Sequence, residues 1–151
     1  MNTLVVYDSI FGNTEKIAYA IGNSLGAKTT KITDLKPDVL DGIELLIVGS
    51  PTRAFRPTPA ITDWIKGLPA NLNGVKITAF DTRTSPDDIK SGILKKMMKT
   101  FGYAAKPIEA ALSKKGGAPA GEPEGFLVTG SEGPLKDGEL ERAVNWASGL
   151  K

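Results

Sequence analysis

A short polar turn at residues 8–15, between an apolar run and a helical repeat, carries the clearest chemical signal in the sequence. The apolar run at residues 4–7 is typical of a strand buried on both faces, and the apolar residues after the turn recur at helical spacing. A helix that begins at Asn13 or Thr14 points unpaired backbone N–H groups and its positive dipole end at the turn. The turn can therefore bind a dianionic phosphate without Lys or Arg.

The side chains of this turn suit a phosphate as well. Ser9 and Thr14 supply hydroxyls, Asn13 supplies an amide, and Gly12 lets the main chain approach a ligand closely. The alternative is an ordinary strand-to-helix turn with Thr14 as the N-cap. The turn lacks both the three glycines of the dinucleotide fingerprint and the Gly-Lys-Ser/Thr ending of a nucleoside triphosphate loop, so it favours a mononucleotide.

A second unusual loop, residues 49–59, follows the apolar run at 45–48 and contains three prolines, two arginines and one aromatic residue. Ligands of open parallel sheets bind beyond the carboxyl ends of the strands, where the strand order reverses. We therefore expect this loop, the phosphate turn and residues 81–84 to face one crevice. A stiff helix entry with Pro59 at the first helical position explains the prolines but not the arginines.

The composition narrows the class of protein. A chain of 151 residues with 40% hydrophobic residues is the size of one globular domain, so we expect a single domain over residues 1–151. Without Cys or His the chain has no disulfides and lacks the commonest metal ligands and the commonest base, so we expect no metal site and no catalytic side chain. A cofactor then carries any reactive atoms. The sequence shows no membrane span or signal peptide, and we expect a cytoplasmic protein without a nucleic acid partner.

Apolar runs alternate with helical patterns along the chain, which is typical of βαβ units around a parallel sheet. Strands are expected at residues 4–7, 29–32, 45–48, 75–80 and 126–129. Helices are expected from residue 13 or 14 to 25 and at residues 59–68, 104–115 and 138–150, with Gly116 and Gly117 ending the third of these.

Residues 85–101 predict an extra helix between the fourth strand and the helix at 104–115. Its broad apolar side either packs on the domain or serves as a partner surface, and because Met and Phe at helical spacing are usually core residues, we expect packing. The surrounding segment, residues 83–115, holds eight basic and three acidic residues, whereas the rest of the chain has an acidic excess. Such a run is either a solvated face or a docking patch.

With residues 8–15 and 49–53 in view, the sequence resembles the flavodoxin family over essentially its whole length. Residues 8–15 resemble the loop for the FMN phosphate, and residues 49–53 resemble the first flavin-ring loop of flavodoxin-like redox proteins, including the quinone-reducing branch. The resemblance implies a three-layer, doubly wound α/β fold with a five-stranded parallel sheet in the order 2-1-3-4-5. It implies FMN between strands one and three, bound by Ser9, Phe11, Gly12, Asn13, Thr14, Pro51, Thr52, Arg53, Ala54, Phe55, Asp81, Thr82 and Arg83.

Two features depart from the pattern of the family. Residues 82–84 read Thr-Arg-Thr where many members place an aromatic residue against the flavin, which leaves Phe11 and Phe55 as the nearest aromatic candidates. The pI near 8.8 contrasts with the acidic electron carriers of the family and implies different partners. Arg53 and Arg83 either stabilise the anionic reduced flavin or pair with Asp81 or Asp63.

Three functions fit these observations. The first is an FMN electron carrier between redox partner proteins, which could dock on the basic segment 83–115. The second is an FMN-dependent oxidoreductase of the NAD(P)H:quinone type, and the third is an interaction domain of the same shape without flavin. Since nothing in the sequence marks a nicotinamide site, the carrier is favoured, and whether the protein is an enzyme stays open.

Overall fold

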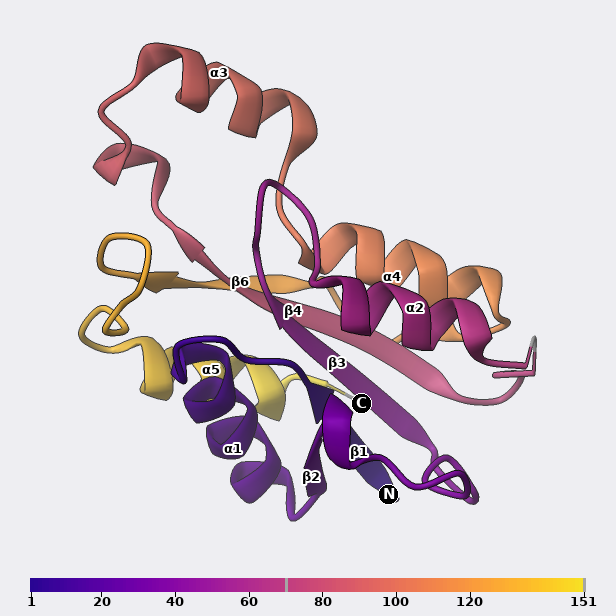
Figure 1. The fold of residues 1–151 in the computed structure, drawn as a ribbon. Helices are drawn as coiled ribbons and strands as arrows, with labels where there is room; N and C mark the ends of the chain where they lie inside the picture. The colour runs from indigo at the N-terminus through magenta and orange to yellow at the C-terminus, as the bar shows by residue number, and fades with distance from the viewer. Residues whose placement is uncertain (70, 151) are drawn as a thin grey trace.

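The computed structural model describes residues 1–69 and 71–150, which form one parallel sheet between two layers of helices (Figure 1). The strands are β1 (Thr3–Tyr7), β2 (Lys28–Lys31), β3 (Leu45–Pro51), β4 (Lys76–Thr84), β5 (Ala118–Pro119) and β6 (Glu124–Val128). The helices are α1 (Asn13–Leu25), α2 (Pro59–Gly67), α3 (Gly92–Phe101), α4 (Ala105–Lys114) and α5 (Glu139–Ser148), with 3-10 turns at Ile32–Asp34 and Pro86–Asp88. None of the helices within these described ranges is both long and apolar enough to cross a membrane.

The strands lie in the order β2-β1-β3-β4-β5, and β6 also pairs with β4. Every one of these pairs is parallel, so the expected order 2-1-3-4-5 is confirmed. The fifth position is divided: β5 pairs with the start of β4 and β6 with its end. The expectation of one strand there is corrected, since two residues that include a proline at a sheet edge carry no strand pattern.

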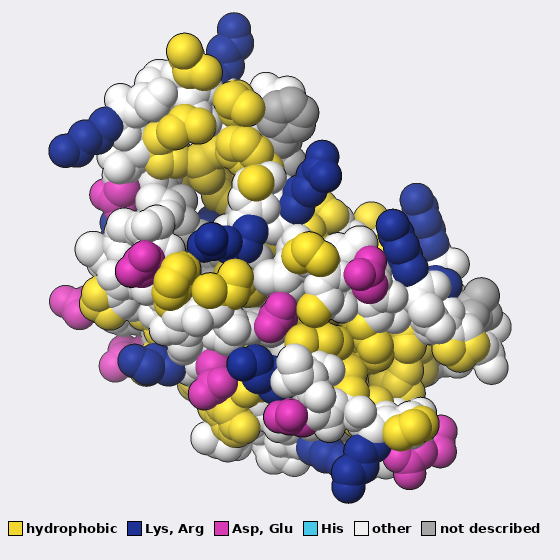
Figure 2. Space-filling view, in the orientation of Figure 1, with side chains coloured by type: hydrophobic (Ala, Val, Ile, Leu, Met, Phe, Trp, Pro, Cys, Tyr) yellow, Lys and Arg dark blue, Asp and Glu magenta, His cyan; other side chains and the backbone are white. Residues whose placement is uncertain are grey.

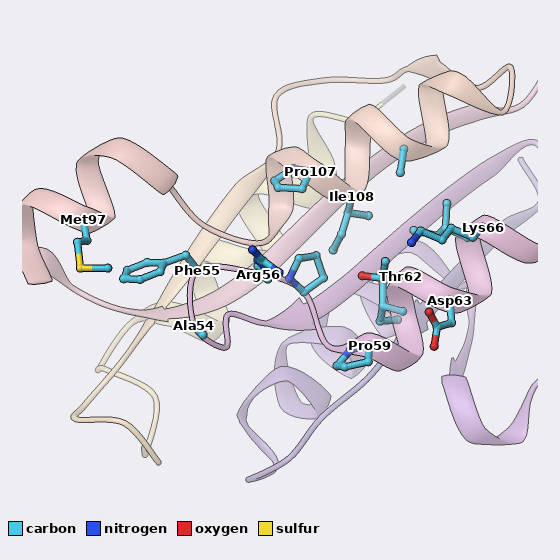
Figure 3. A pocket seen from close by; sticks show the side chains of 14 residues that line it. Ala54, Phe55, Arg56, Pro59, Thr62, Asp63, Lys66, Met97, Pro107 and Ile108 are labelled. Carbon is cyan, nitrogen blue, oxygen red and sulfur yellow. The ribbon is translucent and has the colours of Figure 1, made fainter.

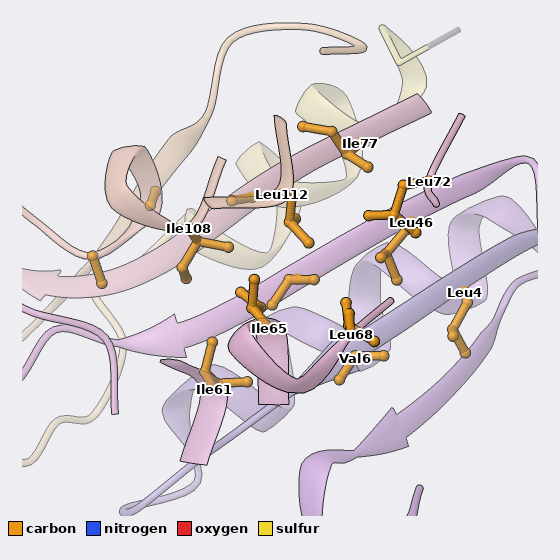
Figure 4. Close-up of a cluster of buried hydrophobic side chains, with 14 residues drawn as sticks. Leu4, Val6, Leu46, Ile61, Ile65, Leu68, Leu72, Ile77, Ile108 and Leu112 are labelled. Carbon is orange, nitrogen blue, oxygen red and sulfur yellow. The ribbon is translucent and has the colours of Figure 1, made fainter. Parts of the chain in front are cut away.

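Alternate side chains of the central strands pack into two cores, as expected of strands that are buried on both faces. Leu4 and Val6 of β1 face α2 and α4, in the cluster shown in Figure 4. Val5 and Tyr7 face α1 and α5. This arrangement brings the carboxyl ends of β1, β3 and β4 to one edge of the sheet, where the expected ligand crevice lies.

The expected extra helix is present, but it begins later and packs differently. A 3-10 turn at Pro86–Asp88 comes first, and α3 begins only after Ser91, whose hydroxyl accepts a hydrogen bond from the amide of Leu94 (3.4 Å). The helix stands away from the body in Figure 1, and Ile93 is 74% exposed. The expectation that its apolar side packs on the domain is wrong, because α2 and α4 already cover that face of the sheet; the side chain of Phe101 lies outside the described residues.

Candidate functional site

The turn after β1 is organised around the hydroxyl of Ser9. Its oxygen accepts hydrogen bonds from the amides of Gly12 (3.1 Å) and Glu15 (3.3 Å). Gly12 occupies the N-cap position of α1 with a φ of +93°, a conformation that favours glycine. The helix therefore begins at Asn13, as expected, and the alternative with Thr14 as N-cap is wrong.

This geometry leaves hydrogen-bond donors available at the first turn of α1. Within residues 1–69 and 71–150, nothing accepts a hydrogen bond from the main-chain N–H groups of Asn13 and Thr14. The side-chain amide of Asn13 donates to the carbonyl of Glu132 (2.8 Å), and the hydroxyls of Thr14 and Thr82 share a hydrogen bond of 2.8 Å. The two free amides and the positive end of the helix dipole make this turn a suitable anion site.

A small pocket of about 40 Å³ lies between this turn and the ends of β3 and β4, which is room for an anionic group but not for a whole nucleotide. It is lined by Ile10, Phe11, Asn13, Thr14, Pro51, Thr52, Arg53, Thr82, Arg83, Thr84, Val128 and Ser131. The lining contains hydroxyls, an amide and two guanidinium groups but no Asp or Glu. This set of donors fits a phosphate.

A second pocket of about 240 Å³ adjoins the first and shares Thr52, Arg83 and Thr84 with it. We call this larger pocket the ring pocket and the loop at residues 49–59 the ring loop. The remaining lining of the ring pocket comes from the ring loop and from the segment around α3: Ala54, Phe55, Ile89, Leu94, Met98 and Tyr103. Apolar and aromatic side chains beside a few polar groups suit a flat ring system. The two pockets together have the polarity of a nucleotide-like ligand, with a donor-rich end and an apolar end.

Arg83 lines both pockets and forms an ion pair with the buried side chain of Asp81. The Asp81 carboxylate accepts hydrogen bonds from Nε and Nη2 of Arg83 (2.6 Å each) and from the amide of Ala105 (2.9 Å). Burial raises the pKa of the Asp81 carboxyl, and Arg83 and the Ala105 amide oppose that rise. Of the two roles open to Arg83, the structure shows the pairing with Asp81, which compensates its charge.

The guanidinium of Arg83 is held between an aromatic ring and the main chain. Its central carbon lies 3.7 Å from the centroid of the Tyr103 ring. On β6, a Cβ added to Gly125 would lie 2.1 Å from the guanidinium, so a glycine there lets the main chain approach closely. Sequence reasoning missed Tyr103, Ile89, Leu94 and Met98; the one available signal was an aromatic residue directly before the pattern of α4.

The ring loop contains a strained two-residue turn. The amides and carbonyls of Arg53 and Arg56 exchange hydrogen bonds of 2.8 and 2.9 Å across Ala54 and Phe55, which have φ angles of +48° and +69°. Turns of this type strongly prefer Gly or Asn, so non-glycine residues in left-handed conformations mark stored strain of the kind found at functional sites. Arg53 forms no ion pair within the described part of the chain, and its guanidinium lies 5.5 Å from the centroid of the Phe11 ring.

The structure brings most of the expected site residues to these two pockets. The smaller pocket is lined by Phe11, Asn13, Thr14, Pro51, Thr52, Arg53, Thr82 and Arg83. Ala54 and Phe55 line the larger one. Ser9, Gly12 and Asp81 do not line either pocket and instead support the residues that do.

The structure is similar to solved flavodoxins. A flavodoxin from the domain Archaea matches with a TM-score of 0.75 and 22% sequence identity over 97% of this chain and 94% of that chain. Oxidised flavodoxin 2 from Bacillus cereus matches with a TM-score of 0.75 and 20% identity over 99% and 97% of the two chains. The flavodoxin, WrbA-like protein from Agrobacterium tumefaciens matches with a TM-score of 0.66 and 19% identity over 99% of both chains. No protein-family model and no curated protein matches the sequence. The strand order and these structural likenesses show that the chain has the flavodoxin-like fold.

Proposed function

We propose that this protein binds FMN and carries electrons between redox partner proteins. The observation that carries this proposal is the donor set at the first turn of α1, where the amides of Asn13 and Thr14 face a pocket lined by no acidic residue. The adjoining apolar pocket supports it, because a flat ring can extend there from the phosphate end. When bound, FMN supplies electron-accepting chemistry, which the side chains of a sequence without Cys or His do not provide.

The residues of the chain have distinct tasks in this proposal. Ser9 and Gly12 fix the conformation of the turn, and Asn13 and Thr14 donate hydrogen bonds to the phosphate. The segment Pro51 to Phe55 and the pair Thr82–Arg83 border the ring, with Tyr103 as a further aromatic neighbour. Because Arg83 is compensated by Asp81, Arg53 is the arginine whose charge is available to a negatively charged, reduced ring.

The partners in this proposal are acidic proteins that dock beside α3. Lys95, Lys96 and Lys99 are exposed on this helix, and Gly92–Phe101 contains no acidic residue. Figure 2 shows hydrophobic side chains on the same part of the surface, with dark blue basic side chains around them. Since Leu94 and Met98 of α3 line the ring pocket, a partner on this helix would lie beside the flavin.

Flavin titration tests the proposal. We expect the protein to bind FMN at least tenfold more tightly than riboflavin, because only FMN carries the phosphate. The hydroxyl of Thr14 can accept a hydrogen bond from Thr82 and donate its own proton to the phosphate. Thr14→Val removes this donor but keeps the main-chain amide, so it should weaken FMN binding about tenfold and leave riboflavin binding unchanged. The matched control is Thr33→Val, whose hydroxyl lies outside both pockets. Equal affinities for FMN and riboflavin, or no flavin binding at all, would contradict the proposal.

The NAD(P)H:quinone-type oxidoreductase is the second candidate. The pocket proposed for the ring is lined on one side by Leu94 and Met98 of α3, and this helix stands away from the body in Figure 1, so a small acceptor could reach the ring there. Rapid oxidation of NADH or NADPH by the flavin-loaded protein with a quinone and no partner protein would select this enzyme. Slow oxidation under the same conditions, with fast reduction by an acidic redox protein, would select the carrier. A flavin-free interaction domain requires that neither flavin binds.

A further inference from the structure

A separate groove of about 790 Å³ runs between α2 and α4, next to the flavin pockets (Figure 3). Its floor is formed by Ile61, Ile65 and Ile108, which belong to the hydrophobic core. Pro107 and Ala111 of α4 form one wall, and Met97 of α3 closes one end. The three isoleucines are almost fully buried, so the accessible apolar surface of the groove comes from Pro59, Pro107, Ala111 and Met97 around them. The groove has the size of a typical small-molecule site.

The polar groups of this groove are few and mainly cationic. Arg56 lies at the end of the ring loop, and Lys66, Thr62 and Asp63 project from α2. In Figure 3 the ammonium of Lys66 and the hydroxyl of Thr62 point toward the groove, whereas the Asp63 carboxylate points away from its centre. Neither Arg56 nor Lys66 forms an ion pair with any residue of the described ranges.

We propose that this groove binds a small amphipathic anion: an apolar body that lies against the proline, alanine and methionine side chains of the groove, with one anionic group held by Arg56 and Lys66. The apolar lining accounts for the body of the ligand, and the two uncompensated cations account for its charge. A neutral apolar ligand would leave both cations without a partner.

The charges of the chain argue against the other possible occupants. The apolar side of α3 is exposed, and this helix could close into the groove of its own chain or of a second copy. Neither arrangement provides a partner for Arg56 or Lys66, because Gly92–Phe101 contains three lysines and no acidic residue. An anionic small molecule can pair with both cations.

The groove also reaches the proposed redox site. Phe55 and Ala54 line both the groove and the ring pocket, and they form the strained turn of the ring loop. A ligand in the groove therefore contacts one side of the loop whose other side borders the flavin. This coupling rests on the proposed function, whereas binding in the groove does not.

Two fluorescent probes with the same apolar body test the proposal. The anionic probe is 8-anilino-1-naphthalenesulfonate, and the neutral one, N-phenyl-1-naphthylamine, lacks the sulfonate. We expect saturable binding of one anionic probe per chain to the protein as purified. Arg56→Gln and Lys66→Gln should each weaken the anionic probe about fivefold and leave the neutral probe unchanged. The matched control is Lys114→Gln, an exposed lysine of α4 outside the groove.

A variant that blocks the groove distinguishes probe binding in the groove from binding elsewhere on the surface. Ala111→Trp fills the groove from α4 and should weaken both probes at least tenfold, with flavin content and thermal stability as checks on folding. Unchanged binding of the anionic probe in all three groove variants would overturn the proposal, as would an equal loss in Lys114→Gln or displacement of the probe by added FMN. A protein that binds no flavin but shows the expected probe dependence would refute the proposed function alone.

Discussion

The ion pair of Asp81 and Arg83 offers a sharp test of how the site is built. Asp81 is fully buried, and two of the three hydrogen bonds to its carboxylate come from Arg83, whose side chain is 22% exposed. Arg83→Met removes both bonds and leaves the buried carboxylate with the hydrogen bond from the amide of Ala105. Breaking a buried pair from one side costs about 3–5 kcal/mol, and because Arg83 keeps some contact with solvent, we expect a loss of about 3 kcal/mol at pH 7.

The loss in Arg83→Met should depend on pH. Without Arg83, the pKa of Asp81 in the folded protein rises further above its ordinary value of 3.8, so the folded state holds the proton more tightly than the unfolded state. The free energy of unfolding is then highest below pH 3.8 and falls as the pH rises through the raised pKa, by up to about 1.4 kcal/mol per pH unit.

Urea unfolding between pH 4 and pH 8 measures both effects. The double variant Asp81→Asn/Arg83→Met should recover to within about 1 kcal/mol of the parent protein, because it leaves no buried charge. Arg53→Met is the matched control: this exposed arginine forms no ion pair in the described residues, and its loss should cost less than about 0.5 kcal/mol. A loss below about 1 kcal/mol in Arg83→Met, or one independent of pH, would refute the reasoning.

Three further variants test other parts of the structure. Burial raises the pKa of Glu139, but hydrogen bonds and charge from Arg142 outweigh it and hold the pKa below 4.5. Ionised Glu139 therefore stabilises the fold above that pH and loses this effect as the pH falls. In Glu139→Gln, the free energy of unfolding should change less between pH 3 and pH 5, as measured by acid titration followed by circular dichroism. Gly49→Ala places a Cβ 2.1 Å from the Phe80 ring and should lower the free energy of unfolding by about 1–3 kcal/mol in urea. Ile93→Gln should change stability by less than about 0.5 kcal/mol, because this side chain is already exposed; a larger loss would mean that α3 packs on the body.

The order of the strands in the sheet could be predicted from the sequence, because the apolar runs that identify the strands are followed by the polar turns expected of this topology. The apolar runs at 4–7 and 45–48 became β1 and β3, and the polar turns after them meet at the same sheet edge. Such strands are buried on both faces, so their composition alone identifies them. The division of the fifth strand could not be predicted, because β5 pairs through main-chain groups and contains Pro119.

The candidate site was predicted where it depends on a motif and missed where it depends on the path of the chain. Asn13, Thr14 and Thr52 belong to turns with their own sequence signal, and all three line the small pocket. Tyr103 and Met98 reach the ring pocket only because the segment after β4 leaves the sheet edge and returns over it. No local pattern encodes that return, and an amphipathic repeat gives the same signal whether its apolar side packs inward or stays exposed.

This return path also explains how a basic chain can serve the proposed role. The apolar side of α3 contributes Leu94 and Met98 to the ring pocket, while its lysines face the surroundings. The environment of the ring and the charge presented to a partner are therefore set by one helix. Because Asp81 neutralises Arg83, the positive charge beside the ring pocket comes mainly from the lysines of α3. Acidic partners would thus be attracted mainly to the three lysines at the edge of the site, whereas Arg53 is the arginine available to the ligand within it. Association rates should therefore depend on salt concentration more strongly than flavin affinity does.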